Sequence, residues 1–324
     1  MIKIQSPVRG TRTSNLSRVD STEDRQAAWS FMHRITAGKI VGLELKYPYD
    51  IAMKVIEAKP TVDKSEYEKE IRLLHSARNC ETIVQFLGAA VVTNFSSTYF
   101  HIIMELMEMD LSRFRDVVPR VESTSLIDFK GAIYDECLLP YIAVSMTWAL
   151  FYLKVRLNTV HSDIKPANVL INLTGEVKIA DLGIAKLIHA EDNTTVSANR
   201  SLTPCYTAPE KLCLISLGNC KSYRGRSDIW SMGVTLHEVA TKKCYYSGQD
   251  FEILSKIVCG EAPVLAYDTG FPGVLCDFVN QCLSKVEDER MNIDTAIQTE
   301  FYRVYGTHSE REKSKERMST VVKE

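Results

Sequence analysis

The sequence predicts an α+β fold in which a small β-rich lobe is followed by a larger, mainly helical lobe. Three observations predict this arrangement. Stretches with strand-like alternation recur up to residue 107, and one amphipathic helix interrupts them. From residue 108 onward, the long apolar segments have helical length. The 324 residues are enough for two lobes of about 100–200 residues each.

The small lobe is expected at residues 29–107, after a flexible arm at residues 1–28 that is rich in Ser, Thr and Arg. Its strands are FMHRI, KIVGLEL, DIAMKVI, ETIVQFLGAAVV and TYFHIIMELM, and Gly38 separates the first two. Its helix is SEYEKEIRLLHSA, where Ser65 and Glu68 have the spacing of an N-terminal capping box.

The larger lobe is expected at residues 108–306. Its long helices are YIAVSMTWALFYLKV, which is apolar on most sides, and SDIWSMGVTLHEVAT. FEILSKIVCG and LCDFVNQCLSKV are expected to form shorter amphipathic helices. Between the long helices, the strands VLINL and EVKIA flank Thr174-Gly175, a hairpin turn signal. The tail at residues 307–324 is dominated by charges, which favours a solvated helix or a disordered end.

Composition narrows the classes of function. The net charge of −2 shows no excess of the positive charge that nucleic-acid binding needs, so no nucleic-acid partner is expected. The apolar runs are short and interrupted, so no membrane insertion is expected. Nine cysteines without a C-x-x-C pair favour reduced thiols over a zinc site or a disulfide framework. We therefore expect a cytoplasmic location, with the nucleus also compatible.

Two charged residues in the small lobe could form a clamp on nucleotide phosphates, a lysine for the phosphates and a carboxylate that pairs with it. Lys54 lies in the otherwise apolar strand IAMKVI, and Glu70 lies in the following helix. The two would pair if the helix packs on the strand, because each charge is costly to bury alone. The alternatives are an edge-strand lysine that reaches solvent and a solvent-facing helix charge.

The larger lobe carries the remaining parts of a phosphoryl-transfer site. Asp163, Lys165 and Asn168 lie in the loop HSDIKPAN after the first long helix, and Asp181 follows a short strand in DLG. Asp163 could orient a substrate hydroxyl, and Lys165 could neutralise the transferred phosphate. Asn168 and Asp181 could bind Mg²⁺ through oxygen atoms. Each residue alone could also be an ordinary turn former or cap.

Over about residues 31–306 the chain resembles the eukaryotic protein kinases. The motifs are IAMK, HSDIKPAN, DLG, TPCYTAPE and SDIW, in that order. The resemblance implies the two-lobed protein kinase fold, ATP and Mg²⁺ as cofactors, and a structural pair between Glu210 and Arg290. It also implies a structural role for Asp228. Lys165, together with Thr203-Pro204, resembles the serine/threonine-directed branch.

Segments between these motifs resemble the dual-specificity MAP kinase kinases, among them HIIMELMEMDLSRF and YRGRSDIWSMGVTLHEVAT. That family phosphorylates a threonine and a tyrosine in the activation loop of a MAP kinase, within a signalling cascade. The implied partners are a MAP kinase substrate and an upstream activating kinase. The implied contacts to ATP are Ile35, Gly38, Ala52, Met104, Met107 and Leu170. Among these, Met104 would be the gatekeeper, Met107 would lie at the hinge, and Ala52 and Leu170 would form walls of the base pocket. Plain core packing is the alternative for Ala52, Leu170 and the two methionines.

Two departures concern nucleotide binding and control. The phosphate-covering loop keeps only the middle glycine, Gly38, in the register of the family, which predicts weaker or differently shaped ATP binding. Ser162 stands where the family has an arginine that binds a phosphorylated activation loop. Its loss should remove a phosphate sensor and leave the catalytic residues intact.

The activation-loop sites do not align cleanly. Counting back from Glu210 places Thr194 or Thr195 at the first phosphorylatable position but Ala198 or Asn199 at the second. Ser197 and Ser201 have the right mutual spacing in a shifted register. Three hypotheses remain open: an active kinase of the MAP kinase kinase type, a pseudokinase scaffold that binds cascade partners, and a small-molecule kinase. Binding of ATP·Mg²⁺ separates the first two.

Overall fold

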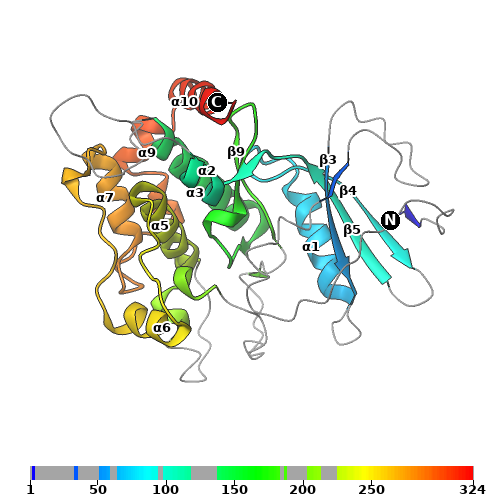
Figure 1. Cartoon of the computed structure of the whole chain (residues 1–324), viewed down its shortest axis with the longest axis horizontal. Coiled ribbons are helices and arrows are strands. Elements are labelled where there is room, and N and C mark those ends of the chain that lie inside the picture. The colour runs from blue at the N-terminus through cyan, green and yellow to red at the C-terminus, as the bar shows by residue number, and fades with distance from the viewer. Residues whose placement is uncertain are drawn as a thin grey trace. The chain divides into compact units, whose positions relative to one another are not determined.

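The computed structural model describes residues 2–3, 33–35, 51–58, 64–93, 98–117, 137–182, 186–187, 203–212 and 225–323 (Figure 1). The chain divides into two compact units, Met1–Met107 and Glu108–Glu324. The first unit is built on a β-sheet and the second is mainly helical (Figure 1). The α+β class predicted by the sequence is confirmed.

Among the described residues of the first unit, five strands form one sheet in the order β1-β4-β5-β3-β2. Their bounds are Ile2–Lys3 (β1), His33–Ile35 (β2), Ile51–Glu57 (β3), Phe86–Thr93 (β4) and Thr98–Glu105 (β5). Strands β3 and β5 are antiparallel, with Ala52 opposite Met104 and Lys54 opposite Ile102. Because paired residues share a face and side chains alternate along a strand, Ala52, Lys54 and Met104 lie on the same face of the sheet.

Helix α1 (Lys64–Ala77) packs against this face. Tyr67 stacks on Phe100 of β5 with ring centroids 4.8 Å apart, and Leu74 is buried. The helix begins at Lys64, one residue before Ser65, and the side chain of Ser65 lies outside the described residues, so the capping box stays a prediction. The predicted strand KIVGLEL lies outside the described residues.

The second unit is organised around two buried helices, α3 (Leu138–Leu157) and α5 (Arg226–Thr241). Both were predicted from their apolar composition, within a few residues of their observed ends. The other helices are α2 (Leu111–Val117), α6 (Asp250–Cys259), α7 (Gly273–Cys282), α8 (Ile293–Ala296), α9 (Glu300–Tyr305) and α10 (His308–Lys323), with 3₁₀ turns η2 (Pro166–Asn168), η3 (Pro204–Tyr206) and η4 (Tyr267–Thr269).

Helix α3 has the length and composition of a helix that could cross a membrane, contrary to the expectation that no segment is long enough. However, 72% of its apolar window is buried inside the protein, where the helix packs against α5, β9 and α10. This burial accounts for its apolar composition, as in the core helix of a globular unit. Asn158 ends the helix with a left-handed backbone (φ 48°), a conformation that asparagine tolerates.

Helix α5 approaches α7 closely because position 233 carries no side chain. A Cβ atom at Gly233 would lie 2.8 Å from Cβ of Cys282 and 2.9 Å from Leu283. Every residue of α5 from Ser227 to Ala240 is buried. The helix therefore provides a rigid support for the segments that pack on it.

The short strands of the second unit carry the loops that contain the candidate site. Among the described residues, β6 (Met109–Asp110), β8 (Val169–Ile171) and β9 (Val177–Ile179) form one sheet, and β7 (Thr159–Val160) pairs with β10 (Lys186–Leu187). Strands β8 and β9 are joined by the predicted hairpin, in which Gly175 has a φ of 83°. A backbone with this φ strains residues that have a Cβ atom, so glycine suits the turn.

The charged tail is helical, but it is not simply solvated. Met318 of α10 is fully buried and Ser314 is nearly so. The Ser319 hydroxyl donates a hydrogen bond of 2.6 Å to the carbonyl of Leu173, and Lys315 pairs with Glu176 at 3.1 Å. Helix α10 is therefore packed on the β8–β9 hairpin.

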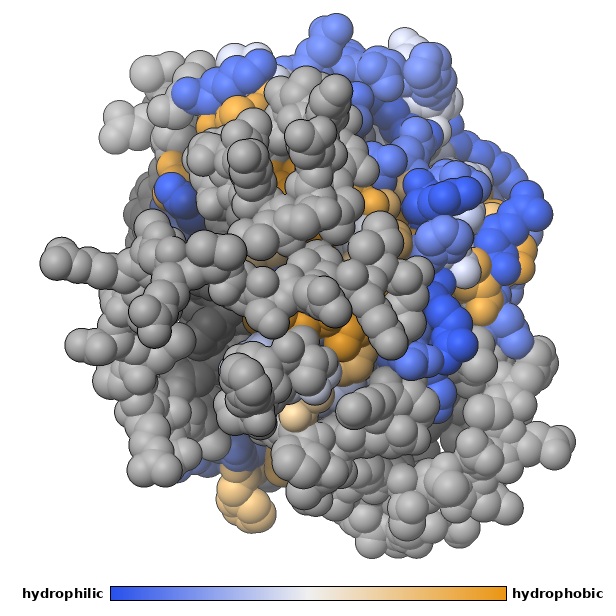
Figure 2. Space-filling view, turned by 90° about the vertical axis from the view of Figure 1, so that its right-hand side faces the viewer, coloured by the Kyte–Doolittle hydropathy of each residue, from blue (hydrophilic) through white to orange (hydrophobic). Residues whose placement is uncertain are grey.

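Figure 2 shows that one face of the protein carries mostly hydrophilic colours where it is described, with smaller hydrophobic patches between them.

Candidate active site

In the first unit, Lys54 and Glu70 form an ion pair between β3 and α1. Lys54 Nζ lies 2.8 Å from Glu70 Oε1, and the Glu70 side chain is only 7% exposed. The packing of α1 on the sheet thus brings together the two residues that the sequence analysis placed at a phosphate clamp. The Lys54 side chain keeps 26% of its surface exposed.

Two of the residues expected around adenine in this unit, Ala52 and Met104, lie beside Lys54 on the sheet. Ala52 and Met104 are buried cross-strand partners, and Met107 is buried at the end of the unit. Ile35 pairs with Ile51 in β2, where only the backbone is described. Gly38 lies outside the described residues. Burial of Ala52 and Met104 fits a pocket wall as well as a packed core.

In the second unit, the loop after β7 gathers three candidate residues around one carboxylate. Lys165 Nζ lies 2.9 Å from Asp163 Oδ2, and Asn168 Nδ2 donates to the same oxygen at 3.0 Å. Among the described residues, both contacts go to Oδ2, so Oδ1 is left to accept a proton from a substrate hydroxyl. The arrangement fixes the carboxylate before a substrate arrives, as general-base catalysis requires.

Asn168 is buried, and its amide group is held in a defined orientation. Besides its contact with the Asp163 carboxylate, Nδ2 donates a hydrogen bond of 2.8 Å to the backbone carbonyl of Asp163. The amide nitrogen is therefore fully used, and the amide oxygen is the atom available to a cation. Leu170, a further candidate contact to ATP, is buried two residues later in β8.

His161 connects this loop to the strand that precedes Asp181. The backbone N–H of Asp163 donates to His161 Nδ1 at 3.3 Å, so Nε2 carries the proton and donates to the carbonyl of Ala180 at 3.0 Å. Ala180 N–H in turn donates to the carbonyl of Asn168 at 2.9 Å. These bonds hold the two halves of the predicted metal site together. His161 lies within the HSDIKPAN motif, but the motif alone indicates no role for it.

Asp228, in the first turn of α5, anchors the catalytic loop, the segment after β7 that contains Asp163. Its two carboxylate oxygens accept the backbone N–H groups of His161, at 2.7 Å, and Ser162, at 2.9 Å. Ser162 and Asp181 both have left-handed backbones, with φ of 70° and 64°. Such conformations are strained in residues with a Cβ atom, and they persist only where the surrounding contacts enforce them.

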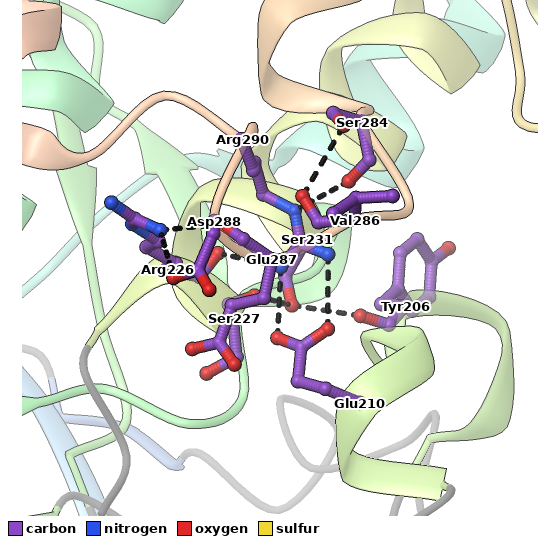
Figure 3. A network of polar contacts seen from close by, with 10 residues as sticks. All are labelled: Tyr206, Glu210, Arg226, Ser227, Ser231, Ser284, Val286, Glu287, Asp288 and Arg290. Atoms are coloured by element: carbon purple, nitrogen blue, oxygen red, sulfur yellow. Dashed lines mark hydrogen bonds and ion pairs between the residues drawn. The ribbon is translucent and has the colours of Figure 1, made fainter.

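Glu210 and Arg290 form the structural pair that the resemblance implied. Arg290 Nη1 and Nη2 donate to the two carboxylate oxygens of Glu210 at 2.8 and 2.9 Å (Figure 3). Arg290 also donates to the carbonyls of Ser284 and Arg226, and its guanidinium group lies 5.1 Å from the ring centroid of Trp230. This arginine therefore ties the segment around Glu210 to α5 and to the loop after α7.

The segment before Glu210 contacts both the catalytic loop and α5. Lys165 Nζ donates a hydrogen bond of 3.1 Å to Thr203 Oγ1, which places Thr203 beside the catalytic residues. Tyr206 donates to Glu238 at 2.7 Å, and burial raises the pKa of this tyrosine. Ser231 of α5 donates to the Tyr206 carbonyl at 2.7 Å. The expected phosphorylation sites Thr194, Thr195, Ser197 and Ser201 lie outside the described residues.

The donors present fit Mg²⁺ bound together with a nucleotide. Within the described ranges, no group of three or more His, Cys, Asp or Glu side chains could hold a metal ion by itself. Asn168 and Asp181 would supply oxygen donors, and the two hydrogen bonds of the Asn168 amide nitrogen leave its amide oxygen as the possible ligand atom. Mg²⁺ commonly takes one or two protein oxygens and completes its shell with phosphates and water.

A model of the protein kinase domain matches residues 40–302, which include the candidate residues of both units. The chain belongs to the protein kinase family. This kinase is 32% identical over 250 residues to MAP kinase kinase mkk-4 of Caenorhabditis elegans, a match that covers 74% of the chain and 63% of the relative.

Two further relatives carry the term dual specificity in their names. Identity is 34% over 224 residues with the dual specificity mitogen-activated protein kinase kinase mek-1 of Caenorhabditis elegans, covering 69% of this kinase and 58% of the relative. Identity is 31% over 241 residues with hemipterous of Drosophila melanogaster, also a dual specificity mitogen-activated protein kinase kinase, covering 73% and 18%. The chain thus spans less than two thirds of the length of each of these relatives.

Proposed function

We propose that this protein transfers the γ-phosphoryl group of ATP to a MAP kinase, on threonine and tyrosine hydroxyls of its activation loop. The observation that carries the proposal is the Asp163 carboxylate, held by Lys165 and Asn168 with one oxygen left for a hydroxyl. The names of the similar proteins support the MAP kinase kinase type. Lys165 and Thr203, which are hydrogen-bonded at 3.1 Å, are the residues at which the chain resembles the serine/threonine-directed branch.

Each charged residue then has a role in the reaction. Lys54, oriented by Glu70, would bind the nucleotide phosphates, and Asn168 and Asp181 would hold Mg²⁺. Bound Mg²⁺ would neutralise charge on the phosphates. Asp163 would accept the proton of the substrate hydroxyl as the oxygen attacks the γ-phosphorus. Lys165 would offset the negative charge that develops on the transferred group.

The first test is nucleotide binding. We expect ATP·Mg²⁺ to raise the melting temperature of the protein, and Lys54→Met and Asp181→Ala each to reduce that shift. Asp163→Asn should retain the shift and lose phosphoryl transfer, because Asp163 acts on the hydroxyl and not on the nucleotide. The absence of any shift with the native sequence would exclude the enzyme and favour a pseudokinase scaffold.

The second test is the substrate. A panel of inactive MAP kinases would be incubated with the protein and ATP·Mg²⁺, and the phosphorylated residues would be mapped by mass spectrometry. We expect phosphate on threonine and tyrosine of one activation loop, and none with Asp163→Asn. Nucleotide binding without phosphorylation of any MAP kinase would leave a kinase of another substrate class.

We also propose an upstream activating kinase. We further propose a cytoplasmic or nuclear location, which the free cysteines of the described residues support.

A further inference from the structure

Strand β4 of the first unit has a long apolar edge on the side that does not face β5. In the sheet order β1-β4-β5-β3-β2, one side of β4 pairs with β5 from Phe86 to Thr93, and β1 lies on the other side. The sequence of β4, FLGAAVVT, contains no charged residue and no proline. Charges and prolines commonly protect a sheet edge, and an edge without them readily pairs with another extended chain. The outer edge of β4 is therefore suited to receive a strand.

The residues that occupy this edge come from the beginning of the sequence. Ile2 is paired with Ala90 and Lys3 is paired with Val91, and the two strands run parallel. Strand β1 is two residues long, whereas β4 has eight residues. Among the described residues, β1 is the only strand on this side of β4. The edge thus offers more positions than β1 uses.

A β-bulge sets where regular pairing on β4 begins. Phe86 is opposite Met104 of β5, but Gly88 is already opposite Ile103, so Leu87 is an extra residue. Such a residue bends the strand and interrupts the ladder locally. Beyond the bulge, the pairing with β5 continues without a further shift to the end of β4. Strand β1 pairs within this regular part, which is where the edge can hold an added strand.

The contact between β1 and β4 is a contact between backbones. In strand addition, N–H and C=O groups of the main chain give the affinity, and alternate side chains give the specificity. The segment MIKIQ alternates isoleucines with Lys3 and Gln5, which is the period of a strand. The chain passes through β2, β3 and α1 before it reaches β4, so no tight turn imposes the pairing. A separate peptide of the same sequence could therefore form the same ladder.

We propose that the outer edge of β4 is a strand-addition site whose occupant is the segment of this chain around Ile2 and Lys3. The segment binds as a parallel strand, and it leaves the edge and returns, because its connection to the sheet keeps its effective concentration high. In the released state, β4 presents alternate N–H and C=O groups to solvent. This inference rests on the strand pairing alone and is independent of the proposed function.

The first test is hydrogen exchange of the full chain, resolved by NMR for each amide. The double variant Ile2→Pro, Lys3→Pro removes two N–H groups from β1 and disfavours the strand, whereas Ile2→Val, Lys3→Arg keeps both groups. Among residues 90–92, amides that face β1 alternate with amides that face β5. We expect the first kind to exchange at least about tenfold faster in the proline variant and the second kind to stay protected. The valine and arginine variant should match the native chain.

The second test is rescue by a separate peptide. The peptide MIKIQSPV, which has the sequence of residues 1–8, would be added to the proline variant. A matched peptide carries methyl groups on the backbone nitrogens of Ile2 and Lys3, which removes the N–H donors and keeps the side chains. We expect the unmodified peptide to restore protection of the same amides and the methylated peptide to have no effect. The unmodified peptide should bind the native chain at least about tenfold more weakly, because its own segment occupies the edge.

The other outcomes contradict the proposal. Equal acceleration at all amides of β4 would mean that the substitutions loosen the whole sheet, and unchanged exchange would mean that β1 does not cover the edge. Self-association of the proline variant in analytical ultracentrifugation, with protection that returns at high protein concentration, would make a second copy of the chain the occupant. If the proline variant does not fold, a chain that lacks residues 1–6 takes its place in both tests.

Discussion

Arg290 shows how one buried charge connects several segments of the second unit. Its guanidinium group donates to Glu210, to two backbone carbonyls and lies over Trp230. The Arg290 side chain is fully buried, so removing Glu210 would leave its charge uncompensated in a medium of low dielectric constant. Breaking the ion pair is therefore expected to destabilise the protein by more than the intact pair stabilises it.

We expect Glu210→Gln to lower the free energy of unfolding by about 3–5 kcal/mol, because it leaves the buried Arg290 without a counter-charge. Arg290→Met should also destabilise the protein. The double variant should lose less than the sum of the two single losses by about 1–3 kcal/mol, since each single change already breaks the pair. Urea unfolding of the four proteins measures these values, and strictly additive losses would show that the two residues do not interact.

His237 makes stability depend on pH. Burial lowers the pKa of this histidine below its ordinary value, and its ring packs edge-on against Tyr245 at 5.6 Å. The folded state therefore favours the neutral ring, while the unfolded chain takes up a proton near pH 6.5. The stability contributed by His237 is complete above pH 6.5 and is lost as the pH falls toward the lower folded pKa. His101 has a pKa shifted in the same direction by burial and adds to the effect.

The expected result is a free energy of unfolding that decreases as the pH falls below 6.5, by at most about 1.4 kcal/mol per pH unit for His237. The variant His237→Gln should reduce this slope, because it removes one group that binds a proton only on unfolding. His308→Gln, at an exposed site, controls for the loss of a histidine. Equal slopes for the native protein and His237→Gln would contradict the assignment.

At the scale of elements, the sequence was most informative where one periodic pattern spans a whole element. Helix α5 was expected at residues 227–241 and found at Arg226–Thr241, and the β8–β9 hairpin was expected from Thr174-Gly175. The packing of α10 could not be predicted, because Ser314 and Met318 are a narrow stripe in a charged helix. Its partner hairpin lies far earlier in the chain. Local patterns contain no information about such distant contacts.

The same limit applies to the candidate site. Motifs named Asp163, Lys165 and Asn168, because phosphoryl transfer needs those residue types in that order. They did not show that Asn168 would use its amide nitrogen on Asp163, or that Asp228 would accept two backbone N–H groups of the loop. These contacts depend on the packing of α5 against the loop, which only the fold provides.

Gly175 provides the test for the docking of α10. A Cβ atom there would lie 2.0 Å from the carbonyl oxygen of Lys315 and 2.7 Å from the amide nitrogen of Ser319. Both are backbone atoms and cannot turn aside. We expect Gly175→Ala to lower the free energy of unfolding by more than about 1–2 kcal/mol, the cost of the left-handed conformation alone.

Hydrogen exchange of residues 308–323 should also accelerate in Gly175→Ala, because the clash displaces α10 from the hairpin. Gly88→Ala is the matched control, since a Cβ atom at Gly88 meets nothing within 4 Å. Unchanged exchange in α10 of Gly175→Ala would mean that the helix is held elsewhere.

At the scale of the whole molecule, the departures from the protein kinase family concern the regulation of activity more than the phosphoryl-transfer reaction. The residues expected to take part in phosphoryl transfer are Lys54, Glu70, Asp163, Lys165, Asn168 and Asp181, and all six are present. Ser162 is different: it lies beside Asp163, its N–H is bound by Asp228, and its side chain is too short and uncharged to bind a phosphate bidentately. The catalytic loop thus keeps its support and lacks the arginine that would sense a phosphorylated activation loop.

We therefore expect dephosphorylation to change the activity of the native protein less than about twofold, because no arginine at position 162 gains a phosphate contact. Ser162→Arg should make activity depend on phosphorylation by about tenfold or more. One charge-assisted hydrogen bond is worth about 1.5–3 kcal/mol, and each 1.36 kcal/mol is tenfold in rate. The substitution adds no new backbone strain, since serine already occupies the left-handed conformation.

Activity would be measured before and after phosphatase treatment, with Ser162→Ala as the uncharged control. A large loss in the native protein that an upstream kinase restores would show that another residue senses the phosphate.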